Sequence, residues 1–230
     1  MTTSASLLER LDATVAQHNR EGAGLYRAIP TREAAQIYVQ QWGLFTRHSR
    51  RCWAWVVGNC PVVEVRRFIT RENLYEEEGA DETSHYEILA RLGVKLGLPR
   101  AAIDAAEALP TTRLALLVWE TLTKNRSWAE GLAAKAVLER VGFPDLRRLR
   151  RDNWKRALGL SDADLGFFTT HIEADEIHGS GAYDLLARYV PPAEHDAAVA
   201  AAQASIEAMM LHSNGIAAAM QARGAILPSE

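Results

Sequence analysis

The chain has 230 residues, of which 48% are hydrophobic and 24% charged, with a formal net charge of −3 and a pI near 6.2. This is ordinary globular composition, and the length suits one domain over residues 1–230. A slightly acidic chain offers no general attraction for nucleic acid or anionic lipid, which favours a small-molecule partner. No apolar run reaches the roughly 20 residues that cross a bilayer, and the N-terminus lacks the apolar core of a secretory signal. We therefore expect a soluble, cytoplasmic protein.

Prolines divide the chain into segments that carry the 3.6-residue periodicity of helices, and no segment shows convincing strand alternation. The pattern predicts an all-α bundle of about seven or eight helices. The terminal segment 193–222 is rich in alanine and is expected to be a packing helix or a homodimer contact. The expected helical stretches are 4–20, 31–50, 61–78 running on or kinking into 80–97, 99–108, 111–125, 127–141, 144–158, 161–188 and 193–222.

The sharpest chemical signal is the run His171-Ile-Glu-Ala-Asp175-Glu-Ile-His178. At about 100° per residue, side chains at i, i+4 and i+7 project within roughly 60° of one another on a helix. One metal centre can therefore meet all three. A polar, solvent-exposed face would explain a lone histidine and aspartate, but two histidines flanking an aspartate on one face favour a metal site.

A second pair is Glu78 and His85, with six residues between them. They share a helical face if the helix continues through Gly79, and Glu82 is the competing ligand at a larger angular offset. Glycine at this point is also compatible with a hinge or a loop. His85 taken alone would be a polar residue in a helical core.

A third segment offers Glu130 and Glu139, which are nine residues apart and so lie on opposite helical faces. Glu139 follows an apolar stretch, which makes it the expected inward carboxylate. Burying an unpaired carboxylate is costly, so an inward Glu139 demands a cation.

Together the candidates supply three nitrogen and three carboxylate donors, the ligand set of a di-iron or di-manganese centre in a helical protein. Zinc fits poorly, because structural zinc usually takes four cysteine-rich ligands and catalytic zinc usually takes three protein ligands. We expect two Fe²⁺ ions per chain, with dioxygen as co-substrate. The predicted metal ligands are Glu78, His85, Glu139, His171, Asp175 and His178.

With these residues identified, the chain resembles the haem-oxygenase-like di-iron oxidases and oxygenases, a group that shares its fold with thiaminase-like proteins and pyrroloquinoline-quinone synthase. Their Glu, His, Glu, His, Asp, His pattern maps onto the six residues above. The similarity spans roughly residues 25 to 190. It implies a single-domain haem-oxygenase-like helical bundle that activates dioxygen to oxidise or oxygenate a small, amino-acid-like metabolite in a biosynthetic pathway.

The local run 72–79 looks especially like the self-sacrificing para-aminobenzoate synthases of this group, which consume a tyrosine of their own and use a nearby lysine. Tyr26 stands near the start of the similar region. However, Leu138 precedes Glu139, Phe167 stands four residues before His171, and no lysine lies between Pro144 and Lys155. The resemblance therefore leaves the use of Tyr26 as substrate open.

Two alternatives remain: a metal-free oxidase similar to pyrroloquinoline-quinone synthase, and a non-enzymatic helical protein that binds a ligand or metal. Thiaminase-like hydrolysis would need a nucleophilic cysteine, and neither Cys52 nor Cys60 has a recognisable setting for one. Both are expected to be buried thiols rather than a disulfide. The arginine-rich segment 147–151 is expected to be mostly a solvated helix face, with one arginine pointing inward toward a substrate carboxylate as the alternative.

Overall fold

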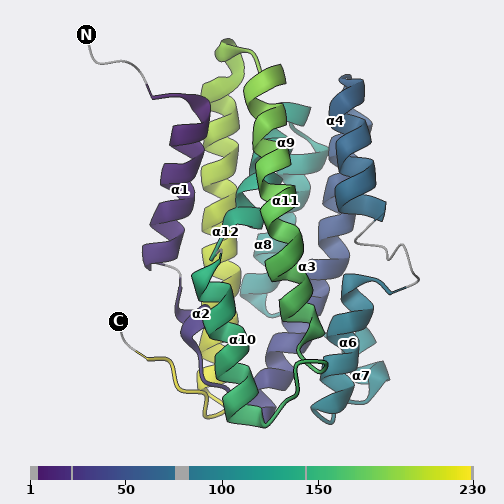
Figure 1. Cartoon of the computed structure of the whole chain (residues 1–230), viewed down its shortest axis with the longest axis vertical. Coiled ribbons are helices and arrows are strands. Elements are labelled where there is room, and N and C mark those ends of the chain that lie inside the picture. Colours follow the sequence, from purple (N-terminus) through teal and green to yellow (C-terminus); the bar gives the residue numbers. More distant parts are fainter. Residues whose placement is uncertain (1–4, 22, 76–82, 143, 229–230) are drawn as a thin grey trace.

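The computed structural model describes residues 5–21, 23–75, 83–142 and 144–228, without the side chains of residues 171 and 173–179. In this part of the chain all regular structure is helical, apart from one isolated bridge between Ile29 and Ile226. The all-α prediction is confirmed. In chain order (Figure 1) the elements are α1 (Leu7–Glu21), α2 (Gly24–Arg27), α3 (Arg32–Asn59), α4 (Val63–Phe68), the π-helix η1 (Ile69–Tyr75), α6 (His85–Lys95), α7 (Arg100–Asp104), α8 (Pro110–Lys124), α9 (Trp128–Arg140), α10 (Asp145–Leu158), α11 (Gly166–Tyr189), the 3-10 turn η2 (Pro192–Glu194) and α12 (His195–Gln221).

The described residues form more helical segments than the seven or eight expected, because the short turns α2 and η2 were not expected and the segment after Pro61 divides into α4 and the π-helix η1. Helix α3 runs on to Asn59, well past the predicted end at residue 50. Nothing before Pro61 interrupts its hydrogen-bond ladder, since the glycines at 43 and 58 are tolerated inside a helix. Helix α11 begins at Gly166 rather than 161, because Ser161 and Asp164 form a closed turn in which each backbone amide is bonded by the other side chain.

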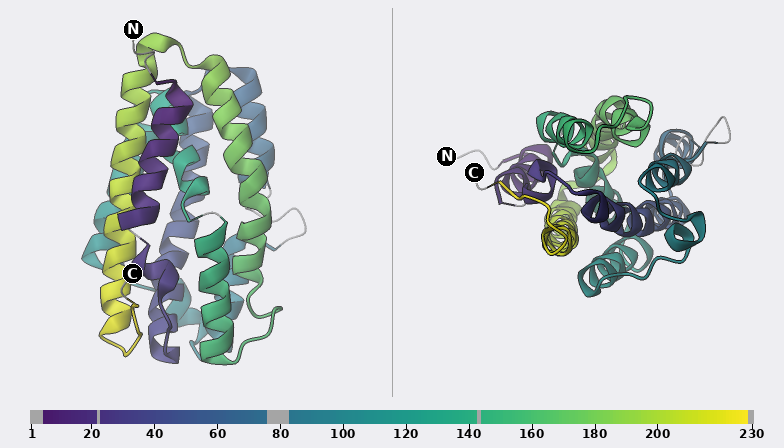
Figure 2. Two further views of the ribbon diagram at one scale, coloured as in Figure 1. Left: turned by 60° about the vertical axis from the view of Figure 1, so that its left-hand side comes forward. Right: turned by 90° about the horizontal axis from the view of Figure 1, so that it is seen from below.

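Helix α9 is the centre of the bundle. It contacts α1, α3, α8, α11 and α12, and Figure 2 shows these long helices running side by side along the bundle axis. Its residues from Gly131 to Leu138 are all buried, and four of them are alanine or glycine. Small side chains on every face let four or more helices approach one axis closely. No helix in the described part of the chain is both long and apolar enough to cross a membrane.

Helix α11 packs against α9, α6, α4 and α10. Its contact with α4 is very close, because a Cβ added at Gly181 would overlap the Phe68 ring. Helices α4 and α6 lie one above the other on the same side of the bundle (Figure 1), so α11 faces both. This arrangement places α11, which carries three predicted metal ligands, between the helices that carry or flank the other three.

Residues 61–97 were expected to form either one continuous helix or two helical segments joined at a kink, and the described residues contradict the continuous form. The described helix ends at Tyr75, and Thr83 and Ser84 are not helical. Ser84 has extended dihedrals, φ −67° and ψ 156°, and caps a new helix that starts at His85. A serine three residues before Glu87 is a common helix-start signal. Helical spacing therefore does not relate Glu78 to His85, and Glu78 itself lies outside the described residues.

Candidate metal centre

His85 is the first residue of α6 and is buried, with 7% of its surface exposed. The start of this helix is fixed by the Ser84 hydroxyl, which accepts a hydrogen bond of 3.3 Å from the Glu87 amide. His85 therefore follows a capped helix start, and its backbone position is set by local hydrogen bonding as well as by packing.

A polar network ties the same helical turn to α7. The Tyr86 hydroxyl donates a 2.7 Å hydrogen bond to Asp104, and the Arg100 guanidinium binds both Asp104 and Glu87. Burial and the bond to Asp104 raise the pKa of Tyr86 to about 12, so this hydroxyl stays a proton donor at neutral pH. The network holds the first turn of α6, and with it His85, against its neighbours.

Glu130 and Glu139 have different roles. Glu130 completes a capping box: its carboxylate accepts from the Ser127 amide at 3.1 Å, and its own amide donates to the Ser127 hydroxyl at 3.2 Å. Glu139, in the last turn of α9, is half-buried, and its carboxylate has no hydrogen bond or ion pair to any residue in the described ranges. The Glu130 carboxylate is committed to a helix cap, whereas the Glu139 carboxylate makes no hydrogen bond or ion pair within the described ranges and interacts electrostatically with the buried Arg147.

His171, Asp175 and His178 lie in the middle of α11, and their side chains are outside the described part of the structure. Their sequence positions continue a helical stripe whose described members are Phe168, Ala182 and Leu186. Those three are almost completely buried, at 1%, 1% and 0% exposure. The three predicted ligand positions therefore lie on the same face of α11 as residues that are buried on either side of them.

Of the six predicted ligands, the structure describes the side chains of two, His85 and Glu139. Among the described side chains, no group of three or more histidine, cysteine, aspartate or glutamate residues could hold a metal ion. The predicted centre would need the side chains of Glu78 and of the α11 histidines and aspartate to complete it. The six-ligand set therefore stays a prediction.

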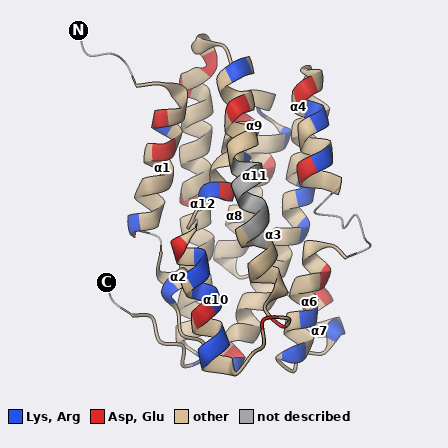
Figure 3. Cartoon of the chain, viewed as in Figure 1, with Lys and Arg blue, Asp and Glu red and all other residues tan. Residues whose placement is uncertain are grey.

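Helix α10 carries several basic residues (Figure 3), and two of its arginines are buried rather than one. Arg147 and Arg150 are 7% and 4% exposed, whereas Arg148 and Arg151 lie nearer solvent beside Asp145 and Asp152. The two buried arginines share a helical face with the fully buried Trp154, at i, i+3 and i+7. The expectation of a mostly solvated face was wrong for this stripe.

Lys135 is a buried cation that the sequence reading missed. It is 1% exposed, donates a 2.6 Å hydrogen bond to the Ser49 hydroxyl, and lies 5.1 Å from the centre of the Trp53 ring. Its burial could have been predicted from its place in the run Gly-Leu-Ala-Ala-Lys-Ala-Val-Leu, because this run has no other polar side chain that would indicate a solvent-exposed face. A lysine inside such a run has no exposed face to occupy.

The tyrosine and thiol candidates are also buried. Tyr26 is 2% exposed and packs on Gly142, whose φ of 72° is easily adopted only by glycine. Lys155, by contrast, is exposed and binds Asp162 at 2.7 Å. Cys52 and Cys60 are both free and buried, and burial raises the pKa of each thiol. A protonated buried thiol is a poor nucleophile, which disfavours thiaminase-like chemistry.

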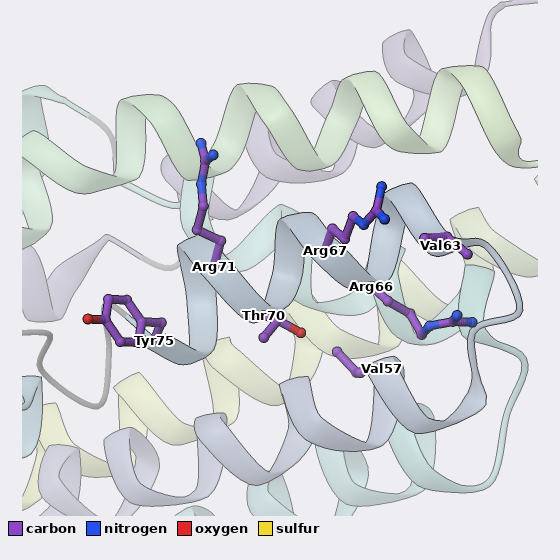
Figure 4. Close-up of a pocket in the computed structure, with 7 residues that line it drawn as sticks. All are labelled: Val57, Val63, Arg66, Arg67, Thr70, Arg71 and Tyr75. Atoms are coloured by element: carbon purple, nitrogen blue, oxygen red, sulfur yellow. The ribbon is translucent and has the colours of Figure 1, made fainter.

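A pocket of about 540 Å³ opens beside α4 and η1 (Figure 4). Its lining contains arginine, valine, threonine and tyrosine side chains but no carboxylate, histidine or cysteine among the described residues, so it lacks the donor types of the predicted metal centre. Arg66 is held by the Cys60 carbonyl at 2.8 Å, and Arg71 is paired with Glu72. The pocket is therefore separate in chemistry from the predicted metal centre. Its lining residues are Val57, Val63, Arg66, Arg67, Thr70, Arg71 and Tyr75.

Residues 36–210 match a family model described as iron-containing redox enzymes. The match covers most of the chain, and the protein belongs to this family. Its fold is that of haem oxygenase: a domain with a haem-oxygenase-like fold from Shewanella denitrificans superposes with a TM-score of 0.76 at 15% identity, covering 94% of this chain and 92% of that one. A TenA homologue from Pseudomonas syringae superposes with a TM-score of 0.72 at 12% identity, covering 91% and 90%.

Two enzymes are similar in sequence over part of their length. The 4-aminobenzoate synthase of Nitrosomonas europaea is 26% identical over 147 residues, which are 64% of this chain and 58% of that enzyme. The pyrroloquinoline-quinone synthase of Pseudomonas putida is 28% identical over 138 residues, 60% of this chain and 54% of that enzyme. The chain thus matches less than two thirds of either relative. These similarities confirm the resemblance seen in the sequence.

Proposed function

We propose that the protein is a non-haem di-iron enzyme that uses dioxygen to oxidise or oxygenate a small, amino-acid-like metabolite. Membership of the iron-containing redox family and the similarity to two biosynthetic enzymes support this class of activity. The ligands would be Glu78, His85, Glu139, His171, Asp175 and His178.

The observation that carries the proposal is the Glu139 carboxylate, whose only described electrostatic interaction is with the buried Arg147 guanidinium. It is half-buried at the end of the central helix, and it makes no hydrogen bond or ion pair to the described residues. A carboxylate withdrawn from water needs a cation or a proton to offset its desolvation. Helix α9 packs on α11, whose predicted ligands could share that cation with Glu139. Carboxylate and imidazole donors in a helical bundle fit iron.

Iron bound there would supply the reduction of dioxygen, and the chain's own part is to hold the ligands and keep water out. The capped start of α6 fixes His85, and the network around Tyr86 holds that helix in place. At the start of α11, Phe167 and Phe168 are each 1% exposed and form a dry wall one turn from His171. A water-excluding wall strengthens electrostatic interactions and limits side reactions at the site.

The test is iron-dependent consumption of dioxygen. Protein loaded with Fe²⁺ under anaerobic conditions and then mixed with oxygenated buffer and a reductant should consume dioxygen, and Glu139→Gln should greatly reduce both bound iron and consumption. Glu130→Gln is the matched control, because it removes the same charge from the same helix. Dioxygen consumption that is equal in all three proteins would contradict the proposal.

The similarity to pyrroloquinoline-quinone synthase supports a second candidate, a metal-free oxidase. The same assay separates the two. Protein stripped with a chelator should lose its activity if iron is required. Full activity in stripped protein would favour the metal-free oxidase, and protein that neither binds iron nor consumes dioxygen would favour a binding role.

A further inference from the structure

Arg150 is a buried cation held among aromatic rings. Its guanidinium carbon lies 4.6 Å from the centre of the Tyr26 ring, 4.8 Å from Phe168, 5.4 Å from Tyr38 and 5.5 Å from Trp42. These rings come from α2, α3 and α11, so the guanidinium lies where three helices meet α10. Ring faces attract a cation, but they accept no strong hydrogen bonds.

The hydrogen bonds of Arg150 distinguish it from its neighbour Arg147. Arg147 donates to the carbonyl oxygens of Val141 at 2.9 Å, Glu139 at 3.1 Å and Leu138 at 3.3 Å, and so binds the C-terminal end of α9. The Nε and Nη1 atoms of Arg150 are buried without an acceptor, and no carboxylate within the described ranges pairs with it. An unpaired buried charge is costly, so its presence needs an explanation other than stability.

Two more donors beside Arg150 also lack an acceptor in the described part of the chain. The Tyr38 hydroxyl and the Trp154 indole nitrogen are both buried and unpartnered. The two rings are 5.0 Å apart, and the Tyr38 ring is also one wall of the arginine cage. One positive charge beside two further unpartnered polar groups that can donate is complementary to an anion with two or more oxygen atoms. A planar guanidinium suits a carboxylate in particular.

The cage includes a ring of α11 one helical turn before the position of the predicted ligand His171. Phe168 stands three residues before His171 on α11, so the two positions share a helical face and are one turn apart. We propose that Arg150, with Tyr38 and Trp154, binds the carboxylate of a small-molecule substrate and directs the rest of that molecule toward the metal ligands. The identity of this anion as a substrate rests on the proposed function. The donors are shielded from solvent in this conformation, so a wall of the cage must move for the ligand to enter.

The binding test uses two matched pairs of probes, benzoate with benzamide and phenylalanine with phenylalaninamide. Binding to metal-free protein is followed by calorimetry, with the tryptophan fluorescence of the whole protein as a second signal. Wild-type protein should bind at least one acid about tenfold or more tightly than its amide, since a hydrogen-bonded ion pair is lost in the amide. Arg150→Gln should abolish this preference. Arg148→Gln, which removes an exposed arginine of the same helix, should retain it.

The inference is overturned if wild-type protein prefers neither acid, or if Arg150→Gln keeps the preference. Iron binding distinguishes this failure from failure of the proposed function. A protein that binds iron but shows no preference for acids would contradict only the carboxylate site. A protein that prefers acids but does not bind iron would contradict only the di-iron function.

Thermal unfolding separates a ligand site from a structural arginine. Arg150→Met removes a buried charge that pairs with no described carboxylate and keeps an apolar side chain among the four rings, so without ligand the melting temperature should stay unchanged or rise. Arg147→Met leaves three backbone carbonyl oxygens without their hydrogen-bond donor and should lower the melting temperature by several degrees. A fall for Arg150→Met as large as that for Arg147→Met would show that Arg150 holds the fold together, and would contradict the proposal.

Discussion

The Phe68 ring of α4 lies against the α-carbon of Gly181 in α11, and the contact is so close that a methyl group on Gly181 would overlap the ring. Gly181 is three residues beyond His178, and Phe68 precedes the π-helix that leads toward Glu78. A π-helical segment is often found beside functional sites. Gly181 therefore sets how closely α4 and α11 approach each other.

A double-mutant cycle on Gly181 and Phe68 tests this relationship. Gly181→Ala alone should lower the free energy of unfolding by about 1–3 kcal/mol, because the new methyl group overpacks against the ring. In a Phe68→Ala background the same change should be neutral or stabilising by up to about 1 kcal/mol, because alanine favours helix more than glycine does. Urea unfolding of the four proteins measures both effects. Equal effects in the two backgrounds would show that the contact does not limit the helix spacing.

The free energy of unfolding should decrease as the pH is lowered, because of His212. This residue lies in α12 within a cluster of aromatic rings that includes Trp42 and Phe45. Burial lowers its pKa to about 3, so the folded protein keeps it neutral while the unfolded chain takes up a proton near pH 6.5. Unfolding is then favoured as the pH falls. Between pH 7 and pH 5 this one group should cost about 2 kcal/mol of stability.

The His212→Phe variant isolates that contribution, because phenylalanine keeps a ring in the cluster and cannot titrate. Its free energy of unfolding should change between pH 7 and pH 5 by about 2 kcal/mol less than that of the wild type. Denaturant unfolding at several pH values gives the comparison. Parallel pH profiles for the two proteins would mean that His212 protonates in the folded state as readily as in the unfolded chain.

Glu130 and Glu139 should separate stability from metal binding. Glu130→Ala breaks the capping box with Ser127 and should cost about 1 kcal/mol of stability without changing the iron content. Glu139→Ala should remove most of the iron and leave apoprotein stability unchanged or raised, because a half-buried carboxylate without a partner is lost. Metal analysis and urea unfolding of both variants check this. Iron loss in Glu130→Ala alone would reverse the assignment.

Helix ends with local chemical signals could be predicted closely. Ser127 with Glu130 fixes the start of α9, Pro110 at the first helical position fixes the start of α8, and Gly159 with a φ of 66° ends α10. Each of these signals acts within one helical turn, so the sequence contains all the information needed. The end of α3 and the π-helical register of η1 depend on packing against other helices, and no local pattern marks them.

The direction of polar side chains was harder to predict than the helices. The i, i+3, i+7 spacing of Arg147, Arg150 and Trp154 predicts one face, but whether that face meets solvent or the core depends on where α10 lies in the bundle. The same holds for Lys135. The continuous helix leading into His85 was expected for a different reason, since Ser84 can cap a new helix as easily as it can lie inside a continuous one.

The most direct test of the di-iron assignment is the iron content of three proteins reconstituted anaerobically with Fe²⁺: the wild type, His178→Ala and His195→Ala. His195 is the matched control, because its ring bonds to the Val190 carbonyl at 3.2 Å at the start of α12, outside the predicted ligand set. We predict about two irons per chain in the wild type and in His195→Ala, and a sharp loss in His178→Ala. Full iron retention in His178→Ala, or equal loss in both variants, would contradict the account.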